Sequence, residues 1–460
     1  MPRGGSLPAH DPTAEDLERL GRFPFVVVSW VDDDGYPISV ATDFRTDAAA
    51  GVVALRQPAG ELLVIPTDRE VNVCGSHIRP KPGEGYDERR YLQLWGAAAA
   101  PDADGEVTFR PTRAWGWDEQ EVPFFEYSER SVPQSRHYLA QLSAEKGRTI
   151  RPRLAAGWLF LRTTRLPFLS ATFVPVLLGI AIAAHHGSFD WGLALLTVLG
   201  GAFAHLGINV ANDIFDTRSG ADEANPNPTK FSGGSRVLLY DLVTFRQLVA
   251  LDVALFGAAI AIGLVLVWLT GSMLLLGIGA VGVLIGLAYT APPLKLVYRG
   301  LGEITVALGF GPVMLLGAYV VQTGRLSWEA AVASVPVAIL IALVLYVNEI
   351  PDRGGDAAAG KRTLPVRLPA NVVTTIYLVA ALGAFAVIVA GVAVGLLPPF
   401  TLLALAAVPL AFRVHRGIQA NYSSPYALMG FMGANVNLHL LAGVGLLVGY
   451  AIAILVAQLT

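Results

Sequence analysis

Long apolar segments recur through the last two-thirds of this 460-residue chain, and they constrain its fold more than any other feature. A helix that crosses a bilayer needs about 17 to 25 predominantly apolar residues. From Pro167 onward, segments of roughly that length follow one another at 167–185, 191–211, 247–270, 272–290, 302–322, 328–348, 371–392, 396–412 and 427–457. The sequence therefore predicts an all-α membrane bundle of nine transmembrane helices.

Charge divides the chain into two unlike parts. The first 165 residues hold 44 of the 69 Asp, Glu, Lys and Arg side chains, although the mean hydropathy of the whole chain is +0.53. We therefore expect a soluble domain at 1–150, a linker at 151–165 and a membrane domain at 166–460. The net charge of −3 comes without a dense basic stripe, so nucleic acid is not an expected partner.

The loops between the apolar segments carry an asymmetry of positive charge. One side of the predicted membrane has a single basic residue, Arg325. The other side has Arg218, Lys230, Arg236, Arg246, Lys295, Arg299, Arg353, Lys361, Arg362, Arg367, Arg413 and Arg416. By the positive-inside rule, the second side is cytoplasmic. We expect a multi-pass integral membrane protein whose soluble domain and active-site loops face the cytoplasm.

Two acid-rich runs end apolar segments on that same side. The first contains Asn209, Asn212, Asp213, Asp216 and Asp222, and the second contains Asn348, Glu349, Asp352 and Asp356. If each run continues its helix, the main acids of each run share one helix face. Crowded carboxylates at a membrane boundary are tolerable only around divalent cations or basic groups. A single pair of this kind is usually a helix cap or surface ion pair, but two clusters on one face favour a site for Mg²⁺ and a phosphorylated ligand.

Basic residues accompany both acidic runs. Lys230 and Arg236 lie in a Gly-rich loop after the first run, and Lys361 and Arg362 follow the second. Two further cations, Lys295 and Arg299, follow the prolines that end the fourth apolar segment. Side chains of this type can neutralise phosphate oxygens that metal ions leave uncovered.

Four separated segments resemble the signature motifs of the UbiA superfamily of intramembrane aromatic prenyltransferases. They read NDIFDTRSGAD at 212–222, YTAPPLK at 289–295, YRGLGE at 298–303 and NEIPDRGGDAAAGKRTL at 348–364. The resemblance covers about residues 160 to 458 and is most similar to the branch containing 1,4-dihydroxy-2-naphthoate polyprenyltransferase of menaquinone synthesis. One departure is Pro351, which bends the chain just before Asp352 where many relatives carry Asn or Arg.

The resemblance implies transfer of an isoprenyl chain from a polyprenyl diphosphate to an aromatic quinone precursor in a cavity between the helices. It assigns two Mg²⁺ ions to Asp213, Asp216, Asp352 and Asp356, and places Tyr289 near the reacting allylic carbon. Diphosphate and metal-shell contacts are implied for Asn209, Asn212, Asp222, Lys230, Arg236, Lys295, Arg299, Asn348, Lys361 and Arg362. Arg162 and Arg165 are candidate contacts for an acceptor carboxylate. His205, alone among apolar neighbours, is more typical of a packed, hydrogen-bonded residue.

The amino-terminal region reads as short strands bounded by turn signals. Strands are expected at 25–31, 38–42, 51–56, 70–75, 91–99 and 106–111, with a hairpin turn at 32–35. We expect a small antiparallel β-barrel or sandwich. The pattern resembles the split barrel of pyridoxamine-phosphate-oxidase-like flavin-binding proteins, which favours the barrel. That resemblance implies FMN, with Arg79, Lys81, Arg89 and Arg90 near its phosphate. A barrel that only binds a partner or orders the membrane part is the equal alternative.

Several alternatives stay open at this stage. The best expectation for the acceptor is 1,4-dihydroxy-2-naphthoate, followed by hydroxybenzoate, homogentisate or a glycerol-phosphate lipid. A secondary transporter also buries ionisable groups in a helical bundle, but places them near the bilayer midplane. A non-catalytic flavin-binding membrane anchor is the third class. The sequence predicts neither the isoprenyl chain length nor the oligomeric state.

Overall fold

The computed structural model describes residues 9–60, 63–81, 85–123, 132–148, 150, 154–225, 228–229, 231–240 and 242–459. The chain separates into two compact units, Met1–Arg151 and Pro152–Thr460.

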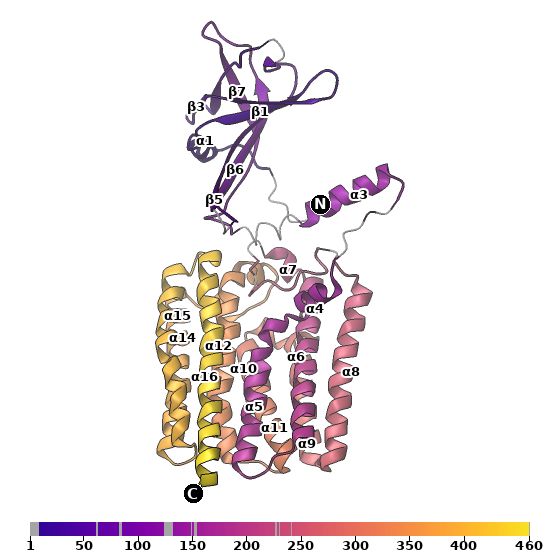
Figure 1. Cartoon of the computed structure of the whole chain (residues 1–460), viewed down its shortest axis with the longest axis vertical. Helices are drawn as coiled ribbons and strands as arrows, with labels where there is room; N and C mark the ends of the chain where they lie inside the picture. The colour runs from indigo at the N-terminus through magenta and orange to yellow at the C-terminus, as the bar shows by residue number, and fades with distance from the viewer. Residues whose placement is uncertain are drawn as a thin grey trace. The chain divides into compact units, whose positions relative to one another are not determined.

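The first unit is built on one antiparallel sheet (Figure 1). Its strands are β1 (Val26–Val31), β2 (Pro37–Thr42), β3 (Phe44–Asp47), β4 (Val52–Arg56), β5 (Val71–Lys81), β6 (Gly85–Ala98) and β7 (Glu106–Asp118), in the order β2-β1-β5-β6-β7-β4-β3. Two helices belong to the same unit, α1 (Ala14–Leu20) and α3 (Val132–Glu145). The expected hairpin turn at 32–35 is confirmed, because β1 and β2 pair from Val26↔Thr42 to Val31↔Pro37 around it.

The expected antiparallel sheet is confirmed, and it forms a curled half-barrel; closure into a complete barrel is not confirmed. In the described residues, the edge strands β2 and β3 are not paired with each other. They are nevertheless joined through Asp43 alone, so the chain itself connects the two edges of the sheet. Arg56 N donates to Asp43 O at 3.0 Å, and Thr42 Oγ1 donates to Arg56 O at 2.6 Å, which fixes β4 beside this connection. The sheet must therefore curl, although no hydrogen-bond ladder closes it.

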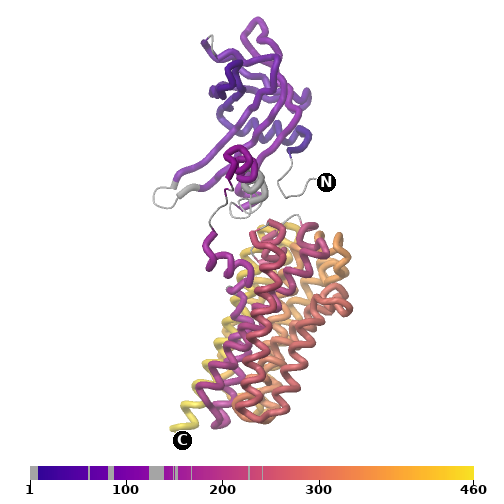
Figure 2. Tube along the Cα trace, turned by 90° about the vertical axis from the view of Figure 1, so that its right-hand side faces the viewer, coloured from indigo at the N-terminus to yellow at the C-terminus, as the bar shows by residue number. Residues whose placement is uncertain are grey.

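The second unit is a bundle of long helices that run side by side (Figures 1 and 2). Its long helical segments are α5 (Ser170–His185), α6 (Trp191–Ser219), α8 (Phe245–Thr270), α9 (Met273–Thr290), α10 (Gly302–Leu308), the π-helical η4 (Gly309–Val313), α11 (Met314–Thr323), α12 (Trp328–Ala358), α14 (Ala370–Ala393), the 3₁₀ segment η5 (Pro399–Ala407), α15 (Val408–Asn421) and α16 (Pro425–Leu459). Shorter helices connect them: α4 (Ala156–Thr164), η2 (Leu166–Leu169), α7 (Ala221–Ala224), η3 (Leu296–Arg299) and α13 (Leu364–Arg367).

Eight helical segments of the described chain are long and apolar enough to cross a membrane. The first expected span forms α5, whose 16 residues correspond to a length of about 24 Å, short of a hydrocarbon core of about 30 Å. The expectation of nine spans is therefore not confirmed. A multi-pass helical membrane fold is what the bundle supports.

α12 is the central helix of the bundle, because its buried residues join those of α5, α14 and α16 in one large hydrophobic cluster. Asn435 of α16 ties three helices together: its Oδ1 accepts from Tyr377 Oη of α14 at 2.8 Å, and its Nδ2 donates to Leu343 O of α12 at 2.8 Å. Polar side chains placed in this way form specific hydrogen bonds between apolar helices.

As expected, Asn209, Asp213 and Asp216 lie on α6, which ends at Ser219, and the second acid-rich run lies on α12, which ends at Ala358. Asp222, the last acid of the first run, lies on the short helix α7. α12 passes through Pro336 and Pro351 without a break. Both α6 and α12 end at the end of the bundle where α4 and α7 lie, opposite the carboxyl terminus (Figures 1 and 2). The fold thus brings the two acidic runs to one rim.

Candidate active site

The acids of α6 are held by partners from four other segments. Asp213 Oδ1 lies 3.2 Å from Arg165 Nη2 and accepts from the backbone N–H of Ser235 at 3.1 Å. Asp216 Oδ1 accepts from Tyr298 Oη at 2.7 Å, and its Oδ2 lies 3.4 Å from Lys361 Nζ. Both carboxylates are buried. The first acidic run is therefore a fixed, desolvated site and not a solvated helix end.

The acids of α12 face the loop that follows α7. Asp352 Oδ1 accepts from Asn225 Nδ2 at 2.6 Å, and its Oδ2 accepts from Gly233 N at 3.0 Å. Asp356 Oδ1 lies 3.6 Å from Lys361 Nζ, the same ammonium group that approaches Asp216. Lys361 therefore links the two acidic runs directly.

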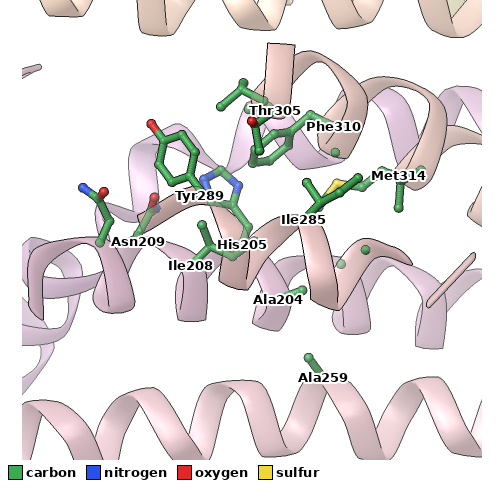
Figure 3. A pocket seen from close by; sticks show the side chains of 18 of the residues that line it. Ala204, His205, Ile208, Asn209, Ala259, Ile285, Tyr289, Thr305, Phe310 and Met314 are labelled. Carbon is green, nitrogen blue, oxygen red and sulfur yellow. The ribbon is translucent and has the colours of Figure 1, made fainter. Parts of the chain in front are cut away.

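Both runs border one cavity of about 810 Å³. Its polar end is lined by Arg165, Asn209, Asn212, Asp216, Asp222, Asn348, Glu349, Asp352, Asp356 and Lys361. The rest of the lining is largely apolar and comes from α6, α8, α9, η4 and α11, as Figure 3 shows for Ala204, Ala259, Ile285 and Met314. Tyr289, His205 and Phe310 lie between these two parts (Figure 3). A charged head with an apolar tail fits such a chamber.

Unsatisfied oxygens at the polar end provide a test of metal binding. Asn212 Oδ1 and Asp356 Oδ2 are buried without a hydrogen-bond donor among the described residues. An oxygen in this state is costly unless a cation or ligand completes it, and Mg²⁺ prefers oxygen ligands. Within the described part of the chain no three acidic, histidine or cysteine side chains alone form a compact metal site. The donors thus fit Mg²⁺ ions whose remaining positions would be filled by substrate oxygens.

Electrostatic interactions at the rim favour the charged forms of Lys361 and Arg165 and the neutral form of Asp222. Burial opposes the charge on Lys361, but the carboxylates of Asp216 and Asp356 outweigh it and raise the pKa of Lys361 well above its usual value. The same balance, with Asp213 as the strongest carboxylate, raises the pKa of Arg165. Burial, followed by repulsion from Asp216 and Asp213, raises the pKa of Asp222 well above its usual value. Negative charge dominates the rim, so additional cations would stabilise it.

Two other predicted site residues, Asn209 and Arg236, donate hydrogen bonds to backbone carbonyl groups. Asn209 Nδ2 donates to Thr164 O at 3.0 Å, so its amide oxygen is left for the cavity. Arg236 is buried and donates to the carbonyl groups of Asp222, Asn225 and Gly233, which makes it a brace of the loop. Lys230 lies outside the described residues.

Three predicted contacts do not line the cavity. The Lys295 ammonium lies 5.2 Å from the ring centre of Tyr298, and Arg299 Nη2 donates to Pro293 O at 3.0 Å. Arg362 is exposed. Asp213 also does not line the cavity, because its carboxylate is turned toward Arg165 and Ser235. The roles of these four residues stay predictions.

Several residues that shape the site had no role predicted from the sequence. Tyr298 bonds to both Asp216 and Ser219, and Asn225 and Gly233 hold Asp352. These residues lie in or beside recognisable motifs. The sequence does not show, however, that the loop with Asn225 and Gly233 pairs with α12, more than a hundred residues away. His205 is buried, as expected, and its Nδ1 lies 2.7 Å from Thr172 Oγ1, yet its ring also lines the cavity.

The described contacts of the sheet in the first unit give no support to the flavin hypothesis. Arg79 Nη2 lies 2.8 Å from Asp87 Oδ2, and Arg89 Nε donates to Glu119 Oε2 at 3.0 Å. Protein carboxylates therefore neutralise two of the four cations that we associated with a phosphate. The guanidinium of Arg90 lies 5.8 Å from the ring centre of Phe23, and the side chain of Lys81 lies outside the described residues.

Comparison with known proteins agrees with the geometry. The model of the UbiA prenyltransferase family matches residues 172–456. The chain therefore belongs to this family, and it is an integral membrane prenyltransferase.

Individual relatives narrow the similarity further. The chain is 27% identical over 294 residues to the 2-carboxy-1,4-naphthoquinone phytyltransferase of Synechocystis sp., covering 64% of this chain and 92% of that protein. It is 26% identical over 313 residues to the 1,4-dihydroxy-2-naphthoate octaprenyltransferase of Bacillus subtilis, covering 67% and 99%. Among solved structures, a UbiA homologue from Archaeoglobus fulgidus bound to DMAPP and Mg²⁺ is 15% identical with a TM-score of 0.46, covering 63% of this chain and 99% of that chain.

Proposed function

We propose that this protein transfers an isoprenyl chain from its diphosphate to 1,4-dihydroxy-2-naphthoate, a quinone precursor. The observation that carries the proposal is one cavity whose polar end joins Asp216 of α6 to Asp352 and Asp356 of α12, while its remainder is apolar. The names of the Synechocystis and Bacillus relatives, which act on naphthalene-ring substrates, support this acceptor. Family membership also disfavours the transporter hypothesis.

Each part of the cavity has a chemical task. Mg²⁺ ions held by Asp216, Asp352 and Asp356, with Asn212, would neutralise the charge that builds on the departing diphosphate. Lys361, which already faces Asp216 and Asp356, is placed to bind a diphosphate oxygen once metal ions occupy the carboxylates. The apolar lining takes the isoprenyl chain and excludes water from the allylic cation. The aromatic face of Tyr289 stabilises that cation.

We also propose that the acidic rim faces the cytoplasm. The rim carries Arg and Lys in the loops around Arg218, Arg299 and Arg367, whereas the opposite loops carry only Arg325. This asymmetry is the topological signal that sets orientation in membranes. A water-soluble acceptor and diphosphate head group would then reach the site from the cytoplasm.

Transfer activity provides the direct test. Purified full-length protein is incubated with Mg²⁺, labelled polyprenyl diphosphate and a panel of naphthoate, hydroxybenzoate and homogentisate acceptors. We expect a prenylated naphthoate product, its loss on removal of Mg²⁺ and its loss in Asp352→Ala. Glu223→Ala is the matched control, because Glu223 is an exposed acid of neighbouring α7. Transfer at the wild-type rate in Asp352→Ala would refute the assignment of Asp352 as a metal ligand. A prenylated product formed from hydroxybenzoate or homogentisate, and not from the naphthoate, would change the assigned acceptor.

A further inference from the structure

A second pair of acids lies beside the metal-binding rim. Glu349 precedes Asp352 by about one turn of α12, is only 4% exposed and lines the cavity. Neither of its carboxylate oxygens has a hydrogen-bond donor among the described residues. Glu303, the second residue of α10, is also buried, and its Oε1 lacks such a donor too. These acids take no part in the metal site described above.

The two carboxyl groups lie within hydrogen-bonding reach of each other. Two ionised carboxylates cannot bond, because each offers only acceptor oxygens. The contact is favourable only when one group carries a proton and donates it to the other. The geometry therefore describes a pair that shares one proton, in the manner of other buried carboxyl pairs.

The two acids have different surroundings. The Glu303 carboxylate accepts from its own backbone N–H and from that of Leu364, and Arg367 of α13 lies near it. Neither oxygen of Glu349 has a hydrogen-bond donor among the described residues, and its charged neighbours are Lys361, which attracts a negative charge, and Asp356, which repels it. Glu349 is the member of the pair that borders the cavity.

Glu349 is also placed where the reaction must occur. Tyr289 of α9, Lys361 and Glu349 all line the cavity, and Tyr289 lies between its polar and apolar parts (Figure 3). The allylic carbon of a bound diphosphate would lie at this junction, since its head group belongs to the rim and its chain to the apolar lining. An aromatic acceptor must meet that carbon beside Glu349.

We propose that Glu349 is a catalytic residue that exchanges a proton with a hydroxyl group of the aromatic acceptor, and that Glu303 is its positioning residue. This inference rests on the proposed function. The allylic C–O bond breaks, and its electron pair leaves with the diphosphate. A π pair of the acceptor ring forms the new C–C bond, the hydroxyl O–H pair becomes part of a ring carbonyl, and the proton passes to the pair. The ring then loses the displaced substituent, either as carbon dioxide from an ionised carboxylate or as a proton that the released diphosphate takes up, and the electron pair of the broken bond returns to the ring. The carboxyl pair gives its proton back to the oxygen, and the ring is aromatic again.

The pair is suited to this task because it holds one proton and can take a second. A lone buried carboxylate would need a full counter-charge, whereas the shared proton spreads one negative charge over two groups. A purely structural role does not account for the position of Glu349. A carboxyl pair that only stabilised the fold would not need to border the cavity, whereas Glu349 does.

The test compares Glu349→Gln, Glu349→Asp and Glu303→Gln with wild-type full-length protein. General acid–base groups contribute about 10²–10⁴-fold, so we expect Glu349→Gln to lose roughly that factor in turnover while KM for the polyprenyl diphosphate changes little. Glu349→Asp should recover part of the rate. Glu303→Gln should displace the acidic limb of the pH–rate profile, which a merely structural Glu303 would leave in place. Asp252→Asn, a partly buried acid of α8 away from the cavity, is the matched control.

Infrared difference spectra test the shared proton without any transfer reaction. We expect a protonated-carboxyl band in wild-type protein that is absent from both Gln variants and unchanged in Asp252→Asn. Identical spectra of the wild-type protein and both Gln variants would overturn the shared proton. Unchanged turnover and pH profile in Glu349→Gln, with active wild-type protein, would overturn only the catalytic role. A wild-type protein that transfers no prenyl group would overturn the proposed function itself, so the two failures are distinguishable.

Discussion

The amide of Asn225 donates a 2.6 Å hydrogen bond to Asp352 Oδ1 and so joins the loop after α7 to the second acid-bearing helix. The carboxylate is aimed by this bond before any ligand arrives. Orienting partners of metal ligands typically change metal affinity or activity by about 10–100-fold when they are removed. The loop therefore acts on the site through a residue that need not touch the metal.

Asn225→Ala should weaken the apparent affinity for Mg²⁺ by about 10–100-fold, because Asp352 loses its orienting donor. The measurement is prenyl transfer as a function of Mg²⁺ concentration, with Glu223→Ala as the control. An unchanged Mg²⁺ dependence would show that the bond has no part in metal binding.

Two adjacent glycines of α12 offer a matched pair of substitutions. A Cβ on Gly355 would lie 2.8 Å from Asn225 Cα, whereas a Cβ on Gly354 meets no atom within 4 Å. Gly355→Ala should push the loop away from α12 at a cost of about 1–3 kcal/mol, and it should reduce transfer. Gly354→Ala should be neutral or stabilising by about 1 kcal/mol.

Thermal unfolding and transfer activity of the two Gly→Ala variants are measured in parallel. Equal effects of both substitutions would contradict close packing between the loop and the helix.

Lys361→Gln should raise the KM for the polyprenyl diphosphate, because the ammonium group that links Asp216 to Asp356 is removed. A hydrogen bond to a charged group is worth about 1.5–3 kcal/mol, which predicts roughly a 10- to 150-fold increase. Arg413→Gln, at an exposed cation of α15, is the control. A KM that stays at the wild-type value would place the diphosphate elsewhere.

The stability of the first unit should depend on pH through Asp16. Burial alone would raise the pKa of this carboxyl, but hydrogen bonds from Thr13 and His10 outweigh it and lower the pKa below 3.8. A lowered folded-state pKa means that the stabilisation is present above pH 3.8 and is lost as the pH falls through the folded value. Asp16→Asn should thus destabilise α1 by about 1 kcal/mol at neutral pH and by less in acid.

Hydrogen exchange of the α1 amides in the full-length protein, at neutral pH and below pH 3, measures this difference. Glu18→Gln is the control, since Glu18 is an exposed acid of the same helix. Equal destabilisation at both pH values would reject the ionic origin of the effect.

The expected helices and strands were largely predictable because their signals are local. Apolar runs such as 247–270 and 371–392 became α8 and α14, and the turn at 32–35 became a hairpin. The ninth span is not confirmed, because the 16 residues of α5 lie just below the length that crosses a bilayer. The barrel failed to close because closure depends on pairing between β2 and β3, which no short segment encodes.

For this protein, the sequence by itself determined the membrane bundle, the two acidic runs and the face of α6 and α12 on which their side chains stand, because helical periodicity and hydropathy are properties of neighbouring residues. Only the tertiary structure decided which groups complete the site: Asn225 on Asp352, Lys361 between the two runs and Glu303 against Glu349. These partners are distant along the chain, and their contacts exist only after packing brings α6, α10 and α12 around one cavity. Burial there removes the water that would otherwise hydrate the carboxylates, so the packed bundle determines which partner each charge must find.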